Sequence, residues 1–93
     1  MSIADQIRHK VTEALQPEKL VIYNDSHLHA GHHAGAQKGE ETHFRLEIVA
    51  SSFAGQSRLA RERRVQAILA AELSGPVHAL QLRLRTPGEE QKA

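Results

Sequence analysis

The chain has 93 residues, which suits one small domain, and a chain of this size buries only about 60–65% of its unfolded surface. Hydrophobic residues make up 40% of it but aromatic residues only 3%, so we expect a core built from Leu, Ile, Val and Ala. The net charge of +1 gives no molecule-wide field of the kind that marks many nucleic-acid-binding proteins. Because there is no cysteine, the chain can form no disulfide and offer no thiolate to a metal.

The sequence contains neither a signal segment nor an apolar run near the ~20 residues that cross a bilayer. We therefore expect a soluble, cytoplasmic protein with no membrane partner. It also lacks the Gly-x-Ser-x-Gly and phosphate-loop motifs and any cysteine nucleophile. Glu40, Glu41 and His43 lie close together in sequence, but we expect these carboxylates to be solvated and the protein not to be an enzyme.

The first predicted element is a helix that begins after Ser2. Ser2 is a good N-cap, and Asp5 stands where a capping box needs its acidic partner. Apolar residues then recur at helical spacing: Ile3, Ile7, Val11 and Ala14 or Leu15. Pro17 ends this helix, and residues 19–25 alternate as a short strand.

A long loop is predicted over residues 26–41, which are rich in Gly, His and small polar residues. The clearest strand follows, because Phe44, Leu46 and Ile48 alternate with polar residues. The loop should therefore join two antiparallel neighbours. After a turn at residues 51–56, the next predicted element is again helical.

Ser57 is the expected cap of a second helix that runs to about Leu73. Its buried stripe should contain five residues: Leu59, Val65, Ile68, Leu69 and Leu73. Gly75-Pro76 ends the helix, and the alternation of Leu80, Leu82 and Leu84 predicts a last strand. Residues 88–93 are polar and are expected to form a frayed tail.

The order is thus helix, strand, strand, helix, strand. The second helix is a crossover, which allows the strands on either side of it to lie parallel. These elements predict an α/β (α+β) two-layer sandwich over residues 1–93, a single domain. Its three-stranded mixed sheet should carry the helices on one face.

Histidine is the most informative residue type, because the chain has seven of them and no cysteine. Neutral imidazole is a common metal ligand, so a metal centre here would take histidines from this chain and other ligands from a partner. His78, at the start of the last predicted strand, is the preferred ligand, and His29 in the long loop is the second. The other candidates are its loop neighbours: His27, His32 and His33.

Each histidine also has a plain structural interpretation. His78 could be half-buried with a ring nitrogen bonded to a carbonyl, and the loop histidines could be solvated and bind metal only adventitiously. His43 is expected to be structural, because it alternates with the buried positions of its strand. His9 lies away from the apolar stripe of the first helix and is expected at the surface.

Several stretches, in this order and spacing, resemble the BolA family over nearly the whole chain. They are residues 24–29 (Asn-Asp-Ser-His-Leu-His), 41–46 (Glu-Thr-His-Phe-Arg-Leu), 49–57 (Val-Ala-Ser-Ser-Phe-Ala-Gly-Gln-Ser), 61–63 (Arg-Glu-Arg) and 69–80 (Leu-Ala-Ala-Glu-Leu-Ser-Gly-Pro-Val-His-Ala-Leu). The resemblance implies a fold similar to class II KH domains, with the element order predicted above. By position it places the family histidines at His78 and His29. Many members read Arg-His-Arg at residues 61–63, so any role of that histidine is not carried over.

The resemblance implies two functions. BolA-like proteins pair with monothiol glutaredoxins as heterodimers and share a two-iron, two-sulfur ([2Fe-2S]) cluster with them and glutathione, in iron–sulfur trafficking or iron regulation. No cofactor is expected in the isolated chain, and the sequence leaves a homodimer of the free chain open. Members of the family are also described as DNA-binding transcriptional regulators of morphology and stress responses.

The alternative of DNA binding has support in the residues themselves. Arg58, Arg61 and Arg64 recur every three residues and should form one ridge of the second helix. Arg83 and Arg85 share one face of the last strand and could join them in holding phosphates. The plain interpretation is a solvated basic helix balanced by its own glutamates. RNA binding in the KH manner is not favoured, because the turn at residues 53–56 has only one glycine.

Overall fold

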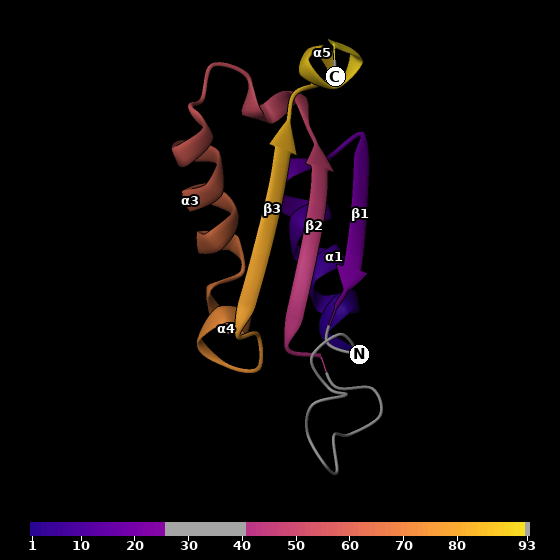
Figure 1. Ribbon diagram of the computed structural model, residues 1–93, viewed down its shortest axis with the longest axis vertical. Coiled ribbons are helices and arrows are strands. Elements are labelled where there is room, and N and C mark those ends of the chain that lie inside the picture. The colour runs from indigo at the N-terminus through magenta and orange to yellow at the C-terminus, as the bar shows by residue number, and fades with distance from the viewer. Residues whose placement is uncertain (26–40, 93) are drawn as a thin grey trace.

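The computed structural model describes residues 1–25 and 41–92, and the main elements follow the predicted order (Figure 1). Within these residues, three strands form one sheet in the order β1 (Lys19–Asn24), β2 (His43–Val49) and β3 (Ala79–Arg85). β1 runs antiparallel to β2, and β2 runs parallel to β3. The predicted sandwich with a mixed sheet is therefore confirmed.

Helix α1 (Ile3–Leu15) has the predicted cap. The N–H of Asp5 donates to Ser2 Oγ at 3.0 Å, and the N–H of Ser2 donates back to the Asp5 carboxylate at 3.3 Å, a complete capping box. At the other end, Gln16 takes a left-handed conformation (φ 47°) and Pro17 follows, so the helix cannot continue.

The second predicted helix is divided into α3 (Arg58–Ile68) and α4 (Ala70–Ser74), where one continuous helix was expected. The irregular residue is Leu69 (φ −102°, ψ 22°). Helical hydrogen bonding continues through it, because Leu69 N–H donates to Val65 and Leu73 N–H donates to Leu69. Leu69 is itself buried in the core, so the two segments still pack as one layer.

The prediction that Leu59 belongs to the buried stripe is wrong, since it is 56% exposed. Val65 and Leu69 are buried as expected. In the first turns of α3 the inward position is occupied by Arg61, which is only 8% exposed. Residues two positions apart point to different sides of a helix, so Leu59 must face outward.

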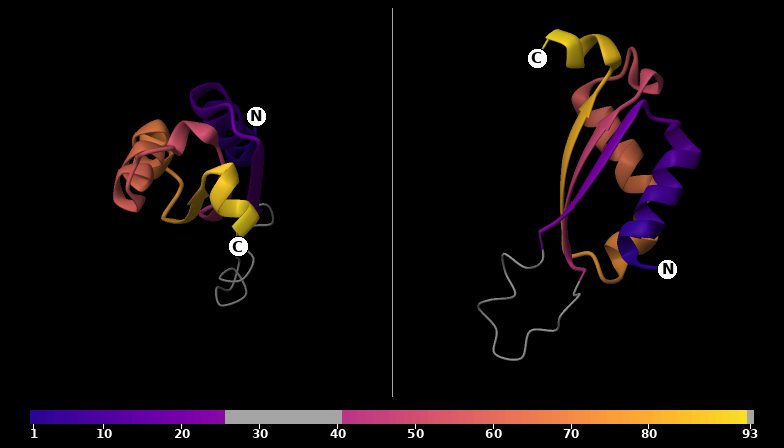
Figure 2. Two further views of the ribbon diagram at one scale, coloured as in Figure 1. Left: turned by 90° about the horizontal axis from the view of Figure 1, so that it is seen from above. Right: turned by 90° about the vertical axis from the view of Figure 1, so that its right-hand side faces the viewer.

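The helices α1 and α3 cover the same face of the sheet, and the core lies between them and the strands (Figure 2). The largest fully buried side chains form this core: Phe44, Phe53, Ile7, Leu46, Ile48, Leu69, Val11 and Val65. The opposite face of β2 carries Arg45 and Glu47, which alternate with the buried residues of that strand. No helix in residues 1–25 and 41–92 is long and apolar enough to cross a membrane.

The expectation of a frayed tail over residues 88–93 is also wrong for the part that is described. Pro87–Lys92 form a short helix, α5, after the end of β3 (Figure 1). Thr86 and Glu89 make a second capping box, in which Thr86 N–H donates to Glu89 Oε1 at 2.9 Å and Glu89 N–H donates to Thr86 Oγ1 at 3.3 Å. The predicted turn before α3 contains a single 3₁₀ turn, η1 (Ser51–Phe53).

Candidate ligand site and basic groove

His78 lies in the turn that leads into β3, and hydrogen bonds hold the backbone on both sides of it. The N–H of Val77 donates to the carbonyl of Glu72 at 2.9 Å, and the N–H of His78 donates to the carbonyl of Thr42 at 2.8 Å. Val77 is buried in the core, whereas His78 is exposed. The structure thus presents the imidazole to the outside from a well-anchored backbone, and the alternative of a half-buried His78 is not supported.

A partly buried ion pair between α1 and α4 supports this turn. The Glu72 carboxylate is 4% exposed and lies 2.8 Å from Lys10 Nζ of α1. The backbone carbonyl of Glu72 accepts hydrogen bonds from Gly75 and Val77. The pair therefore joins α1 to α4 at the residue from which the turn before β3 starts. Its partners are 62 residues apart, so no local sequence pattern indicates the pair.

The histidine-rich segment at residues 26–40 lies outside the described residues. Four candidate ligands fall there: His27, His29, His32 and His33. On either side of the segment, Asp25 N–H donates to the carbonyl of His43 at 2.8 Å, and Thr42 accepts the N–H of His78. Both flanking ends therefore lie at the end of the sheet where β2 and β3 begin. A shared site of His29 and His78 stays a prediction.

Glu41, which the sequence suggested was merely solvated, is a cap of α1. Its two carboxylate oxygens accept the N–H groups of Ile3 and Ala4, each at 3.0 Å. These are unpaired donors at a helix N-terminus, where negative charge is also favoured by the helix dipole. Glu41 thus ties the start of β2 to α1, close to the carbonyl that holds His78.

The other two described histidines, His43 and His9, do not join His78 in a site. His43 Nδ1 is 2.8 Å from Thr42 Oγ1 and is partly buried at the start of β2, in keeping with a structural role. His9 is exposed on α1 and lies 3.3 Å from Glu13. In the described parts of the chain, no three His, Asp or Glu side chains are grouped so that they could hold a metal ion. Any metal bound by His78 would need further ligands from outside those residues.

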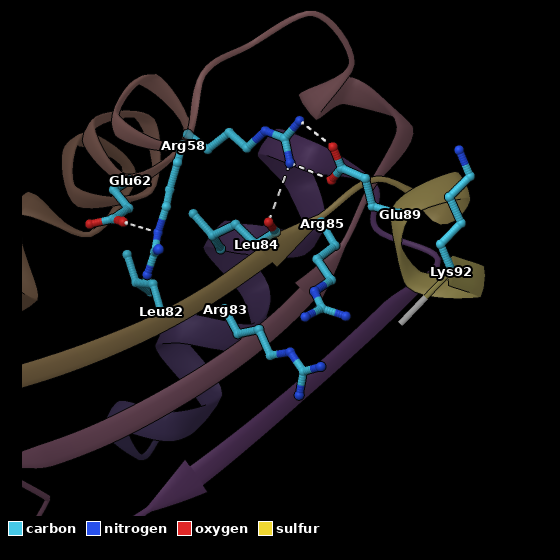
Figure 3. A pocket seen from close by; sticks show the side chains of 9 residues that line it. Arg58, Glu62, Leu82, Arg83, Leu84, Arg85, Glu89 and Lys92 are labelled. Carbon is cyan, nitrogen blue, oxygen red and sulfur yellow. Dashed lines mark hydrogen bonds and ion pairs between the residues drawn. The ribbon is translucent and has the colours of Figure 1, made fainter.

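A basic groove of about 560 Å³ runs along β3 between α3 and α5 (Figure 3). Its charged lining consists of five cationic and two anionic side chains: Arg58, Arg61, Arg83, Arg85, Lys92, Glu62 and Glu89. That is a formal excess of three positive charges in one groove, against +1 for the whole chain. The near-neutral composition therefore conceals a local positive field.

Arg61 is built into the wall of this groove rather than displayed on it. Its Nη1 and Nη2 lie 2.6 and 3.0 Å from the two carboxylate oxygens of Glu89, and it also donates to the carbonyls of Gln56 and Leu84. Hydrogen bonding to Arg61, with help from Thr86, lowers the pKa of Glu89 from 4.5 to about 2. The Arg61 side chain is only 10% exposed.

The other arginines predicted to bind phosphates differ in their exposure and in the contacts that they already make. Arg64 Nη1 donates to the carbonyl of Ser52 at 2.9 Å, which anchors η1 to α3. Arg58 is the most open, with an 89% exposed side chain 3.3 Å from Glu62. Arg83 and Arg85 lie 3.8 Å from Glu47 and 3.5 Å from Glu90, distances at which an ion pair is weak. The proposed ridge is therefore not continuous: the structure leaves Arg58 and Arg83 exposed but commits Arg61 and Arg64 to the fold.

Comparison with known proteins identifies a family model and relatives that match most of this chain. The family model described as "BolA-like protein" matches residues 11–89. The human protein named BolA-like protein 1 is 51% identical over 83 residues, which are 89% of this chain and 57% of that protein. A protein of Haemophilus influenzae named DNA-binding transcriptional regulator BolA is 40% identical over 93 residues, covering all of this chain and 84% of that protein.

Among solved structures, BolA1 from Arabidopsis thaliana superimposes with a TM-score of 0.88 at 38% sequence identity. The match covers 96% of each chain. None of these three relatives carries a name that describes an enzymatic activity. With a family model that spans most of its length and relatives of this similarity, the chain belongs to the BolA-like protein family.

Proposed function

We propose that this chain is an adaptor that pairs with a monothiol glutaredoxin and supplies His78 to a [2Fe-2S] cluster shared with that partner and glutathione. The observation that carries the proposal is the geometry of His78, an exposed imidazole on a backbone held by Thr42 and Glu72. A donor in this position can complete a coordination sphere whose thiolates come from another protein. Such a cluster, when bound, supplies one-electron redox chemistry, and an imidazole ligand raises its potential relative to a thiolate.

The test mixes the chain with a monothiol glutaredoxin, iron, sulfide and glutathione, and records the visible absorption and circular dichroism of the assembled complex. We expect His78→Ala to change the cluster bands and weaken the heterodimer. His9→Ala is the matched control, since His9 is also exposed but lies on α1. His29→Ala asks whether a second histidine takes part. A cluster spectrum that is identical in the wild type and His78→Ala would reject the assignment.

DNA binding is the second candidate function, and one specific observation favours it. The groove beside β3 concentrates an excess of three positive charges, with Arg58 and Arg83 exposed on its walls. Phosphate contacts supply most of the affinity of a nonspecific DNA complex. The name of the Haemophilus influenzae relative agrees with this function.

Fluorescence anisotropy with labelled duplex DNA tests this candidate. We expect Arg58→Ala and Arg83→Ala to weaken binding and each to reduce the salt dependence by about one counterion. Arg8→Ala changes the charge equally but alters an exposed residue of α1 that does not line the groove. Equal losses in all three variants would show that the groove has no special part in binding. Arg61→Ala is less informative, because it would also remove a buried contact of the fold.

A further inference from the structure

The short helix α5 lines one end of the basic groove and places the carboxylate of Glu89 against Arg61. Glu89 holds Arg61 through two hydrogen bonds, and the next residue, Glu90, lies 3.5 Å from Arg85 and 3.3 Å from Lys19 of β1. Of the five arginines that the sequence offers to phosphates, Arg61 is thus occupied by a carboxylate of α5, whereas Arg85 only lies near one. Figure 3 shows the Glu89 side chain extending from α5 toward α3, away from the guanidinium of Arg85.

Apolar packing contributes little to this placement of α5. The helix has six residues and none of them is buried. A helix this short is not stable by itself in water. It is held instead by the Glu89 and Glu90 ion pairs and by the capping box with Thr86. An element attached mainly through charges can be released by a ligand that offers stronger charges.

We propose that α5 is an autoinhibitory latch, in which the Glu89 carboxylate occupies Arg61 until the phosphates of duplex DNA displace it. This inference rests on the second candidate function. Phosphate and carboxylate both match the two-pronged geometry of a guanidinium, so each can satisfy Arg61. DNA adds a dense row of charges that α5 lacks, and it can engage Arg58 and Arg83 at the same time.

We expect Glu89 to leave Arg61 because another anion competes for the guanidinium, not because the carboxylate is protonated. Because Arg61 lowers the pKa of Glu89 to about 2, this carboxylate stays ionised throughout the physiological range. Acidification to moderate pH therefore leaves the latch closed. A competing polyanion opens it at neutral pH.

The central variant is Glu89→Gln, measured in the full-length chain by anisotropy with labelled duplex DNA. Glutamine keeps an oxygen for the capping bond to Thr86 but loses the ionic hold on Arg61. Its matched control is Glu62→Gln, which removes one negative charge from the same groove but leaves the Arg61–Glu89 pair intact. We expect Glu89→Gln to tighten binding about tenfold and Glu62→Gln only about two- to threefold.

A second variant leaves the charge unchanged. Thr86→Ala removes the hydroxyl that caps α5, which should loosen the helix and tighten DNA binding about fivefold. Hydrogen exchange without DNA provides an independent measurement, in which the amides of α5 should exchange faster in both Thr86→Ala and Glu89→Gln than in the wild type. Circular dichroism establishes that each variant is folded.

The outcomes separate the latch from the function on which it rests. DNA binding by the wild type that Glu89→Gln does not strengthen beyond Glu62→Gln would overturn the latch alone. Failure of the wild type and both loosened variants to bind DNA would remove the second candidate function and the latch with it. Tight binding by Glu89→Gln and Thr86→Ala, with weak or undetectable binding by the wild type, would support both.

Discussion

Tyr23 on the open face of the sheet is held between opposite charges. Its hydroxyl donates to Glu47 Oε2 at 2.9 Å, and the guanidinium of Arg45 lies 4.1 Å from the ring centroid. The hydrogen bond to Glu47 and the negative charge of that carboxylate raise the pKa of Tyr23 above its usual value of 10.0. A single side chain thus reports on the electrostatics of the uncovered sheet face.

We expect Glu47→Gln to lower the pKa of Tyr23, because the neutral amide no longer disfavours the phenolate. Absorbance of tyrosinate during an alkaline titration measures this directly, since Tyr23 is the only tyrosine of the chain and there is no tryptophan. A raised pKa means that the neutral form is stabilised by folding. That stabilisation is complete below the unfolded pKa and is lost as the pH rises through the folded pKa.

The matched control is Glu13→Gln, because Glu13 is an exposed carboxylate of α1 that pairs with His9. It should leave the Tyr23 titration in place. A titration curve that is the same in Glu47→Gln and the wild type would contradict the assignment of the shift to Glu47.

At the scale of elements, α1 depends on a residue from a distant part of the chain. The Glu41 carboxylate accepts the N–H groups of Ile3 and Ala4, while the side chains of Ser2 and Asp5 accept each other's backbone N–H groups. We expect Glu41→Ala to destabilise the protein by about 1–2 kcal/mol, through loss of a charged cap at the helix N-terminus. Chemical denaturation measures the change in the free energy of unfolding.

Glu13→Ala provides the comparison for this prediction, because it also removes a carboxylate connected with α1. Its exposed pair with His9 should contribute less than about 0.5 kcal/mol. Hydrogen exchange should show faster opening of the first turn of α1 in Glu41→Ala only. Equal effects of the two substitutions would mean that the two hydrogen bonds accepted by Glu41 contribute no net stability.

Local signals explain which elements were predictable. The Ser2–Asp5 capping box and the alternation of Phe44, Leu46 and Ile48 are each contained within a few residues, and both predictions are confirmed. The missed α5 also has a local signal: Thr86 at the cap, Pro87 at the first helical position and Glu89 three residues after the cap. The polar composition of the tail favours the opposite prediction, a frayed end.

Long-range contacts explain what periodicity could not predict. Arg61 occupies the inward side of α3 because Glu89, 28 residues away, pairs with it there. Without that partner, periodicity alone assigns the arginine to the solvent face and Leu59 to the core. The resemblance to the family identified His78, but its exposure and its hydrogen bond to Thr42 depend on the parallel pairing of β2 with β3.

At the scale of the whole molecule, the ion pair between Lys10 and Glu72 connects the N-terminal helix to the turn that carries His78. Glu72 is almost fully buried, whereas the Lys10 side chain is 38% exposed. Lys10→Ala leaves the Glu72 carboxylate buried without this partner, and we expect a loss of about 1–2 kcal/mol in unfolding free energy. Lys19→Ala is the control, because the more exposed Lys19–Glu90 pair should contribute less than about 1 kcal/mol.

A double variant distinguishes the charge from the packing. If the cost of Lys10→Ala comes from an unpaired buried carboxylate, then Lys10→Met combined with Glu72→Leu should recover most of the stability, since apolar pairs often replace buried ion pairs without loss. Urea unfolding of the wild type, Lys10→Ala, Lys19→Ala and the double variant measures the change in stability. The slope of the unfolding free energy against urea concentration should be the same in all four. The amide of Val77, which bonds to the carbonyl of Glu72, should exchange faster in Lys10→Ala than in the double variant. A double variant that is no more stable than Lys10→Ala would show that the charges themselves hold α1 against α4.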